Sequence, residues 1–154
     1  MKNEITVKAF FLSIFLSIIL SSAMTYLGLY AGMTISASIP AAIMSMGILR
    51  LFKESNILEN NIVQTAASAG ESLAAGVIFT LPALLLVGYW ETISYMEVTK
   101  IAMVGGILGA LFTVPLRRAL ILKAQLRFPE GVATAAVLKT GHETDSKKSN
   151  QSLR

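Results

Sequence analysis

Amide, hydroxyl and carboxylate side chains recur at helical spacing between residues 56 and 72. On a helix, at about 100° per residue, they share one face: Asn60, Asn61, Gln64, Thr65, Ser68, Glu71 and Ser72. A face of amide, hydroxyl and carboxylate groups suits a helix that turns its polar side toward a water-filled path. The pattern therefore predicts a substrate path or an ion-coupling site.

Glu71 is the strongest candidate for coupling to an ion or a proton. It stands at the start of a long uncharged stretch, residues 72–90, and an ionisable group at membrane depth is costly and usually functional. A helix-start carboxylate that faces lipid headgroups is the alternative interpretation. Glu59 falls on the apolar side of the same helix, and we expect it in the first turn, where the helix dipole favours a carboxylate.

The rest of the sequence offers no metal site, cofactor motif or enzymatic triad. Its single histidine, His142, lies in a polar C-terminal segment, and cysteine is absent, so a structural zinc site cannot form. The glycines at 105–109 lack the Gly-x-Gly-x-x-Gly spacing of nucleotide-binding loops, and no Gly-x-Ser-x-Gly nucleophile motif occurs. We therefore predict no metal, no cofactor and no enzyme activity.

The composition indicates that this chemistry is set in a membrane. Of the 154 residues, 54% are hydrophobic and 14% are charged, against about 25% charged in an average soluble domain. A soluble domain of this length would need more polar surface to cover its core. The formal net charge of +4 follows the expected topology and forms no patch for nucleic acid. We therefore expect membrane lipid, and not nucleic acid, as a partner.

Uncharged stretches locate the membrane spans. Residues 9–49 carry no charge and are long enough for two crossings of about 20 residues each, with a break at the glycines of 28–32. The sequence predicts an all-α, polytopic membrane protein whose transmembrane portion covers residues 1–141. About four spans are expected, at residues 7–30, 33–52, 72–90 and 98–116. Residues 142–154 are rich in Ser, Lys and Asn and predict a disordered polar tail.

The polar helix, residues 59–71, is predicted to be either re-entrant or interfacial. Interfacial helices usually carry Lys and Arg on the polar face and large aromatic side chains on the other, and this stretch has neither. The composition favours a re-entrant or cavity-lining helix with its polar side toward a water-filled path.

The distribution of Lys and Arg predicts the orientation in the membrane. With four crossings and the N-terminus inside, every basic residue except Lys100 lies on the inner side, as the positive-inside rule expects. We therefore predict a multi-pass protein of the cell (inner or plasma) membrane whose N-terminus and C-terminus are both cytoplasmic.

Five residues are candidates for helix breaks or close helix approach. Pro40, Pro82 and Pro115 each fall within a different predicted span, and an interior proline removes a backbone hydrogen bond that lipid cannot replace. Gly28 and Gly32 form a small-xxx-small pair that permits close packing. Proline-interrupted spans favour a transporter or channel, and packing within any helical bundle is the alternative.

Several segments, taken in order, carry a family resemblance. They are residues 26–29, 36–42, 57–65, 68–76, 79–83, 115–118 and 129–135, with Glu59-Asn60-Asn61-x-x-Gln64-Thr65 as the most specific block. Together they resemble the N-terminal part of the oligopeptide transporter family, which includes the yellow-stripe metal-chelate transporters. The prokaryotic branch of that family is the most similar.

The resemblance implies a secondary transporter for oligopeptides or peptide-like metal chelates, coupled to protons. Its implied partners are the peptide or chelate substrate, protons and the remaining helices of a larger fold. Family members are several times longer, so we expect a fragment or a truncated form. The alternatives are a small independent four-span protein, acting as a homo-oligomeric exporter or an assembly partner, and a non-functional gene remnant.

Overall fold

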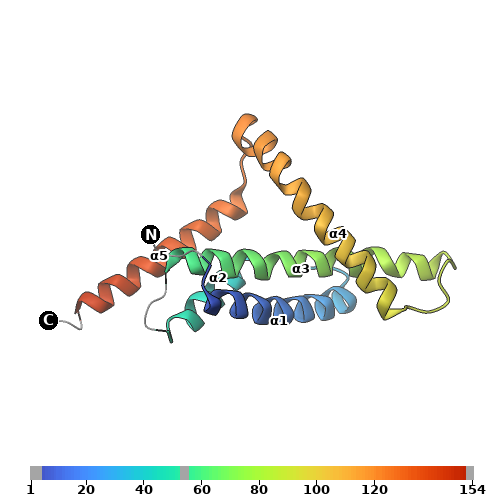
Figure 1. The fold of residues 1–154 in the computed structure, drawn as a ribbon, viewed down its shortest axis with the longest axis horizontal. Helices are drawn as coiled ribbons and strands as arrows, with labels where there is room; N and C mark the ends of the chain where they lie inside the picture. Colours follow the sequence, from blue (N-terminus) through green and yellow to red (C-terminus); the bar gives the residue numbers. More distant parts are fainter. Residues whose placement is uncertain (1–4, 53–55, 152–154) are drawn as a thin grey trace. The chain divides into compact units, whose positions relative to one another are not determined.

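The computed structural model describes residues 5–52 and 56–151 of the chain, and beyond residue 143 only the backbone. Every regular element within these residues is helical (Figure 1). The order is α1 (Val7–Ala31), α2 (Ser38–Leu49), α3 (Ile57–Leu86), α4 (Tyr95–Leu116), the π-helical segment η1 (Arg117–Lys123) and α5 (Pro129–Gln151). The prediction of an all-α protein is confirmed for this part of the chain.

The chain divides into two compact units, and two of the boundaries between them fall inside α1 and α3. The first unit comprises Met1–Leu20, Ser36–Glu71 and Pro129–Arg154, and the second comprises Ser21–Ile35 and Ser72–Phe128. The first unit therefore contains the polar stretch that the sequence singles out, together with α2 and α5.

Three helices are long and apolar enough to cross a membrane. They are Val7–Ala31, Ile57–Leu86 and the combined helix Tyr95–Lys123, which includes η1. This arrangement agrees with a polytopic membrane protein, and it places the predicted first and fourth spans, residues 7–30 and 98–116, on long apolar helices.

The predicted second span, residues 33–52, differs from the structure. Residues 33–37 are not helical, and α2 has only 12 residues, which extend about 18 Å at 1.5 Å per residue against a hydrocarbon core of about 30 Å. Gly32 is the physical reason, since its φ of +70° ends α1 in the left-handed conformation that only glycine adopts without strain. Pro40 lies in the first turn of α2, where its missing N–H leaves no helical hydrogen bond unmade.

The predicted amphipathic helix, residues 59–71, and the predicted third span, residues 72–90, form one continuous helix. α3 has 30 residues, about 45 Å in length, and no separate re-entrant or interfacial helix is present within the described residues 56–72. Gly70 costs about 1 kcal/mol relative to alanine inside a helix, which is too little to end one flanked by good helix formers. Pro82 lies inside α3, and the helix continues only to Leu86.

Pro115 does not end the helix in which it lies, either. α4 continues past it into η1, whose residues 117–123 are π-helical. A π-helical turn replaces i→i+4 hydrogen bonds by i→i+5 bonds, and the bond from the Ala124 amide to the Ala119 carbonyl, at 3.0 Å, has this spacing. The proline therefore precedes a change of helix type rather than a break.

Most of the segment that the sequence predicts as a disordered polar tail, residues 142–154, lies within α5. α5 begins at Pro129 and continues to Gln151, because no proline interrupts it and a helix that is already nucleated extends at little further cost. Residues 152–154 of the predicted tail lie outside the described residues. Three of the basic residues that predict the orientation, Lys2, Lys53 and Arg154, also lie outside them.

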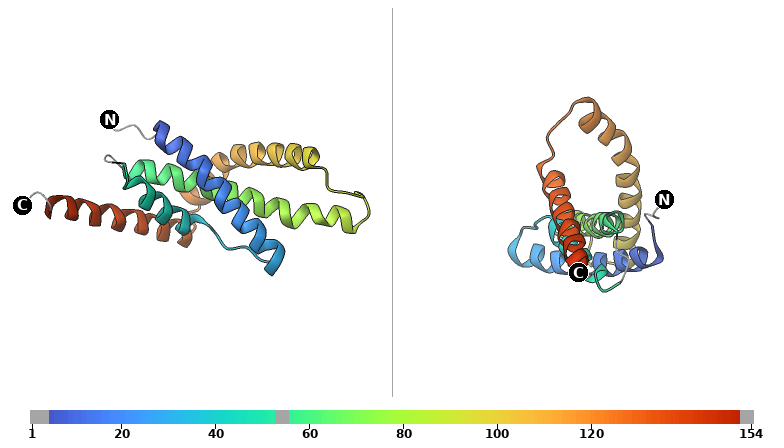
Figure 2. Two further views of the ribbon diagram at one scale, coloured as in Figure 1. Left: turned by 90° about the horizontal axis from the view of Figure 1, so that it is seen from below. Right: turned by 90° about the vertical axis from the view of Figure 1, so that its left-hand side faces the viewer.

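α2 and α5 pack side by side in the first unit, with their N-termini at the same end (Figure 2). The Ser36 side chain, just before α2, contacts Glu130 in the first turn of α5. Further along the two helices, Gly141 faces the Met46 side chain so closely that a Cβ atom would overlap its sulfur. Thr134 and Leu138, one turn apart on α5, are both buried. The two helices are therefore parallel neighbours.

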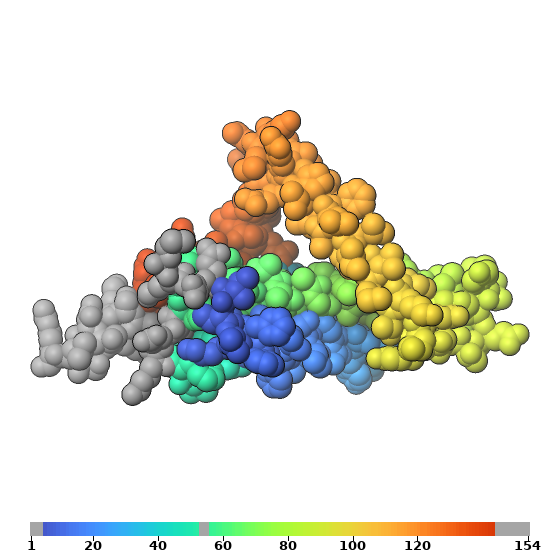
Figure 3. All heavy atoms as spheres, in the orientation of Figure 1, coloured from blue at the N-terminus to red at the C-terminus, as the bar shows by residue number. Residues whose placement is uncertain are grey.

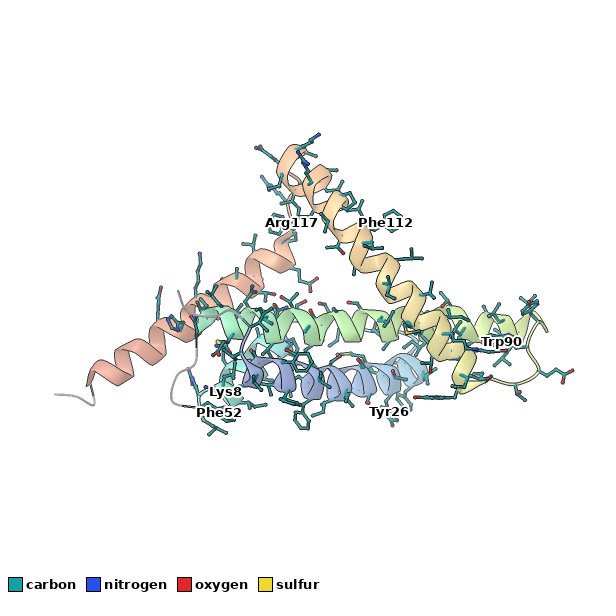
Figure 4. The ribbon with its side chains drawn as sticks, in the orientation of Figure 1. Lys8, Tyr26, Phe52, Trp90, Phe112 and Arg117 are labelled. Carbon is teal, nitrogen blue, oxygen red and sulfur yellow. The ribbon has the colours of Figure 1, made fainter. Side chains whose placement is uncertain are left out.

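Lys8 of α1 and Phe52, shortly after α2, meet in the same unit. The Lys8 Nζ atom lies 5.8 Å from the centre of the Phe52 ring (Figure 4), within the range of a cation–π interaction. The start of α1 and the end of the α2 segment therefore lie at one end of the first unit.

Candidate functional site

The buried side of α3 in the first unit is polar. Glu59, Asn60, Gln64 and Glu71 are each less than 8% exposed, and Val63 and Ala67 complete the same side. Residues four apart lie above one another on a helix, so the series 59, 63, 67 and 71 forms one stripe with a carboxylate at each end. Burial of so many polar groups is costly unless they find partners, which makes this stripe the candidate site.

The structure divides the predicted polar face. Asn60, Gln64 and Glu71 are buried, whereas Asn61, Thr65 and Ser72 are exposed and Ser68 is partly exposed. Glu59, which the sequence places on the apolar side, joins the buried group. The turn of 100° per residue explains this, since a buried stripe centred on Val63 and Ala67 includes Glu59 and leaves out Asn61.

Glu59 caps the start of α3. Its Oε2 atom accepts a hydrogen bond from the Asn56 backbone amide at 3.2 Å, and Asn56 directly precedes the first helical residue. This geometry is half of a capping box, in which a carboxylate at the third position satisfies the N-cap amide. Glu59 therefore has a structural role at the helix start, close to the one expected from the helix dipole.

Asn60 joins α3 to α2. Its Oδ1 atom lies 3.3 Å from the Ser45 hydroxyl, and its Nδ2 atom donates to the Asn56 carbonyl at 3.3 Å. The Ser45 hydroxyl also lies 3.0 Å from the Ala42 carbonyl. The Asn56 side-chain Nδ2 atom is buried nearby without a hydrogen-bond partner in the described part of the chain. This end of the stripe is thus a buried amide and hydroxyl cluster with one unused donor.

The middle of the stripe satisfies itself within α3. The Gln64 Nε2 atom lies 3.5 Å from the Ser68 hydroxyl, and its Oε1 atom lies 3.3 Å from the Thr65 hydroxyl. Thr65 in turn donates to the Asn61 carbonyl at 2.7 Å. Local bonds of this kind compete with outside partners, so Thr65 and Ser68 hold Gln64 in place.

A second polar group lies at the N-termini of α2 and α5. The Ser36 hydroxyl donates to the Glu130 Oε1 atom and lies 3.1 Å from the Ser38 hydroxyl. Hydrogen bonds from Ser36 and then Ser38 lower the pKa of Glu130 below its ordinary value of 4.5. Glu130 is not among the site residues predicted from the sequence. The available signal is that Glu130 is the sole charged residue between Arg127 and Lys139.

Gly28 and Gly32, the predicted small-xxx-small pair, have different roles in the second unit. A Cβ atom on Gly28 would overlap the Ile78 side chain of α3, and the Thr34 methyl group is also close. Gly32, by contrast, has open space around it and serves as the end of α1. Gly106 of α4 lies close to Leu73 of α3, since a Cβ atom on Gly106 would be 3.5 Å from the Leu73 Cδ2 atom. Small residues thus allow α1 and α4 to approach α3 closely.

No group of three or more His, Cys, Asp or Glu side chains comes together to hold a metal ion among the residues that the structure describes. The polar cluster and stripe are built from amides, hydroxyls and separate carboxylates, which suit hydrogen bonding to a passing solute or the exchange of a proton.

Comparison with known proteins identifies the setting of this site. Residues 4–153 match the family model described as "OPT oligopeptide transporter protein". The chain belongs to the oligopeptide transporter family. A relative from Haemophilus influenzae, provisionally named as an oligopeptide transporter, is 52% identical over 107 residues, which cover 70% of this chain and 17% of the relative. No solved structure matches the chain.

The family assignment confirms the resemblance seen in the sequence and makes the chain part of a transporter family. The chain spans about a sixth of the length of the curated relative that it matches. The buried stripe of α3 therefore belongs to a membrane protein of the oligopeptide transporter family. The polar side chains of the stripe are its candidate transport residues.

Proposed function

We propose that this chain acts in a secondary transporter that moves oligopeptides, or peptide-like metal chelates, across the cell membrane with proton coupling. The observation that supports the proposal is the buried stripe of α3. Asn60, Gln64 and Glu71 lie on the buried side of a helix that is apolar enough to span a membrane. An ionisable residue buried in such a helix is usually part of an ion or substrate pathway.

Within this proposal Glu71 is the coupling residue, and Asn60 and Gln64 contact the substrate. Glu71 is 4% exposed and lies on a helix apolar enough to span a membrane, where an ionisable side chain is usually functional. Amides supply both donors and acceptors to a peptide backbone. Asn61, Thr65 and Ser68 are more exposed, and in this proposal they lie along the substrate path beside the buried stripe.

The topology that fits this function has a discontinuous second crossing, formed by the non-helical residues 33–37 and the short helix α2. Transporters place binding sites at such breaks. The contact between Lys8 and Phe52 supports a return of the chain to the side from which α1 began. Both termini are then cytoplasmic, as the distribution of basic residues favours.

α4 presents apolar side chains that lipid or further protein would cover in the membrane. Three of its apolar side chains, Leu111, Phe112 and Val114, are more than half exposed, and Figure 3 draws the atoms of α4 in yellow to orange. Lipid, the remaining helices of the transporter or a second copy of the chain would cover them in the membrane.

The test is a chimera in which this chain replaces the matching segment of the Haemophilus relative, expressed in cells that lack peptide uptake. We expect uptake of a labelled tetrapeptide that increases with an inward proton gradient and is abolished by a protonophore. The chimera that carries Glu71→Gln should lose the gradient dependence. Uptake by neither chimera, when the unmodified relative is active, would reject the proposed function.

A further inference from the structure

Three side chains from two distant parts of the sequence meet where α2 and α5 begin. Ser36 and Ser38 flank the end of the non-helical segment 33–37, and Glu130 lies in the first turn of α5, 94 positions from Ser36. The Ser36 hydroxyl lies 3.1 Å from the Ser38 hydroxyl, accepts from the Ser38 backbone amide at 3.4 Å and donates to Glu130. We call these three residues the Glu130 cluster.

The cluster holds a negative charge, and no ion pair of Glu130 with a basic side chain is present among the residues that the structure describes. The hydrogen-bond partners of Glu130 within the described chain are hydroxyl groups, and residues 9–49, which include both serines, carry no charge at all. The two serine hydroxyls keep the pKa of Glu130 below 4.5, so the carboxylate is ionised at neutral pH. Ser36 and Glu130 are both exposed, and a solute can reach them.

The oxygen atoms of the cluster suit an ammonium group. A primary ammonium carries three donors and no acceptor, and a carboxylate with two neighbouring hydroxyl oxygens offers acceptors for each of them. A serine hydroxyl rotates freely and can present a lone pair in place of its proton. Charge-assisted hydrogen bonds of this kind are about twice as strong as neutral ones.

We propose that Glu130, Ser36 and Ser38 bind the N-terminal ammonium group of a peptide substrate. This inference rests on the proposed function and gives it a point of recognition on the substrate. The stripe of α3 would then contact the peptide backbone, and the Glu130 cluster would select for a free amine.

The opposite polarity is the competing possibility. The N-termini of α2 and α5 carry partial positive charge, which would attract the carboxylate end of a peptide if Glu130 moved aside. Glu130 already occupies that position through its contact with Ser36, so a ligand carboxylate would have to displace it. The two alternatives predict opposite effects when Glu130 loses its charge.

The test measures peptide binding to the full chain in lipid nanodiscs by isothermal titration calorimetry. Three probes are compared: tetra-alanine, N-acetyl-tetra-alanine and tetra-alanine amide. We expect N-acetylation to weaken binding by at least about tenfold, the loss typical of a charged hydrogen bond, and C-terminal amidation to have a smaller effect. Because this comparison uses the unmodified protein, it does not depend on the folding of a variant.

Glu130→Gln should weaken the binding of tetra-alanine to the level of the acetylated peptide and leave the acetylated peptide unaffected. Glu97→Gln is the matched control, since Glu97 is also an exposed acid in the first turn of a helix. Ser36→Ala should give a smaller loss of the same selectivity.

The outcomes separate the inference from the proposed function. Equal binding of the free and acetylated peptides would overturn the inference and leave peptide transport intact. Stronger binding of tetra-alanine to the Glu130→Gln variant would overturn it in favour of the carboxylate alternative. Failure of the unmodified chain to bind any of the three peptides would contradict the proposed function, and the inference would fall with it.

Discussion

The Ser45 hydroxyl of α2 lies 3.3 Å from the Oδ1 atom of Asn60 on α3, and both side chains are buried, with exposures of 0% and 5%. The contact joins two helices through polar side chains at a buried position, where apolar side chains could be buried at a lower cost in free energy. Asn60 extends the link to the Asn56 carbonyl through its Nδ2 atom. A buried amide that bonds across two helices favours one arrangement of them, because other arrangements leave it unsatisfied.

Asn60→Ala should destabilise the first unit, whereas Asn61→Ala should not. Removing the Asn60 amide deletes its hydrogen bonds with the Ser45 hydroxyl and the Asn56 carbonyl, and a hydrogen bond of this kind contributes about 0.5–1.5 kcal/mol. Asn61 is exposed, and exposed substitutions usually change stability by less than about 0.5 kcal/mol. Thermal unfolding of the two variants in the same detergent provides the comparison.

The double variant Ser45→Ala/Asn60→Ala serves as the control for Asn60. If the two side chains act together, the double variant should lose less stability than the sum of the single variants. Strict additivity would show that the 3.3 Å contact carries no coupling, and that the loss in Asn60→Ala comes from its other partners.

Glu71→Gln should flatten the pH dependence of uptake in the Haemophilus chimera. A glutamine keeps the size and hydrogen-bonding capacity of the side chain but cannot exchange a proton. We expect the rate with a proton gradient to fall to the rate without one. The measurement is labelled tetrapeptide uptake between pH 5.5 and 8, buffer values chosen around the range in which cells operate, with Glu97→Gln as the control for loss of one acid. A Glu71→Gln chimera with unchanged gradient dependence would remove Glu71 from the coupling step.

The sequence is sufficient to predict the helical class, the membrane setting and the family, and it identifies Asn60, Gln64 and Glu71 as a group. It fails where packing, rather than local pattern, decides. Glu59 and Asn61 differ by two positions, and the side of α3 that becomes buried depends on Val63 and Ala67 meeting the rest of the first unit. Glu130 is near Ser36 only because α2 and α5 pack in parallel, and no local spacing reports such a contact.

Local sequence pattern also does not decide which of the predicted helix-break residues end a helix. Pro82 and Pro115 stay inside helices, while Gly32 ends one through its positive φ. A proline removes a single hydrogen bond, and neighbouring bonds or a π-helical turn can absorb the loss. A left-handed residue redirects the backbone itself, so it ends a helix more effectively.

Gly28→Leu should destabilise the second unit, and Ile78→Ala should restore part of the loss. Even a Cβ atom on Gly28 would overlap the Ile78 side chain, and a leucine there forces α1 and α3 apart. Overpacking of this kind costs about 1–3 kcal/mol. Thermal unfolding in detergent measures the loss and the rescue.

Gly47→Leu is the matched control, because a Cβ atom at Gly47 meets nothing within 4 Å. We expect it to be neutral or slightly stabilising, since leucine has a higher helix propensity than glycine. Equal losses for the Gly28 and Gly47 variants would indicate that the close approach of α1 to α3 has no energetic consequence.

The contribution of Glu130 to the packing of α5 on α2 should disappear in acid. Hydrogen bonds from Ser36 and Ser38 lower the pKa of Glu130 in the folded chain below 4.5, so the folded state favours the ionised form. The stabilisation is then complete above the ordinary pKa and is lost as the pH falls through the lowered one. Unfolding temperatures of the wild type and Glu130→Gln should differ at pH 7 and converge below pH 4.5.

Glu97→Gln provides the reference for this experiment, because any general effect of acid on a first-turn carboxylate should also appear there. A difference between wild type and Glu130→Gln that grows as the pH falls would contradict the assigned direction, since it would require Glu130 to stabilise the fold in its protonated form.

Single-cysteine labelling should place Leu51 and Glu91 on opposite sides of the membrane. The natural sequence contains no cysteine, so each introduced thiol is the only target. Glu91 lies between α3 and α4, whereas Leu51 follows α2 at the end of the first unit marked by the contact between Lys8 and Phe52. A membrane-impermeant maleimide applied to intact cells should label Glu91→Cys and spare Leu51→Cys. Both should react after permeabilisation, because both positions are exposed. Labelling of Leu51→Cys in intact cells would mean that residues 33–52 do not return the chain to the cytoplasmic side, and the discontinuous second crossing would be wrong.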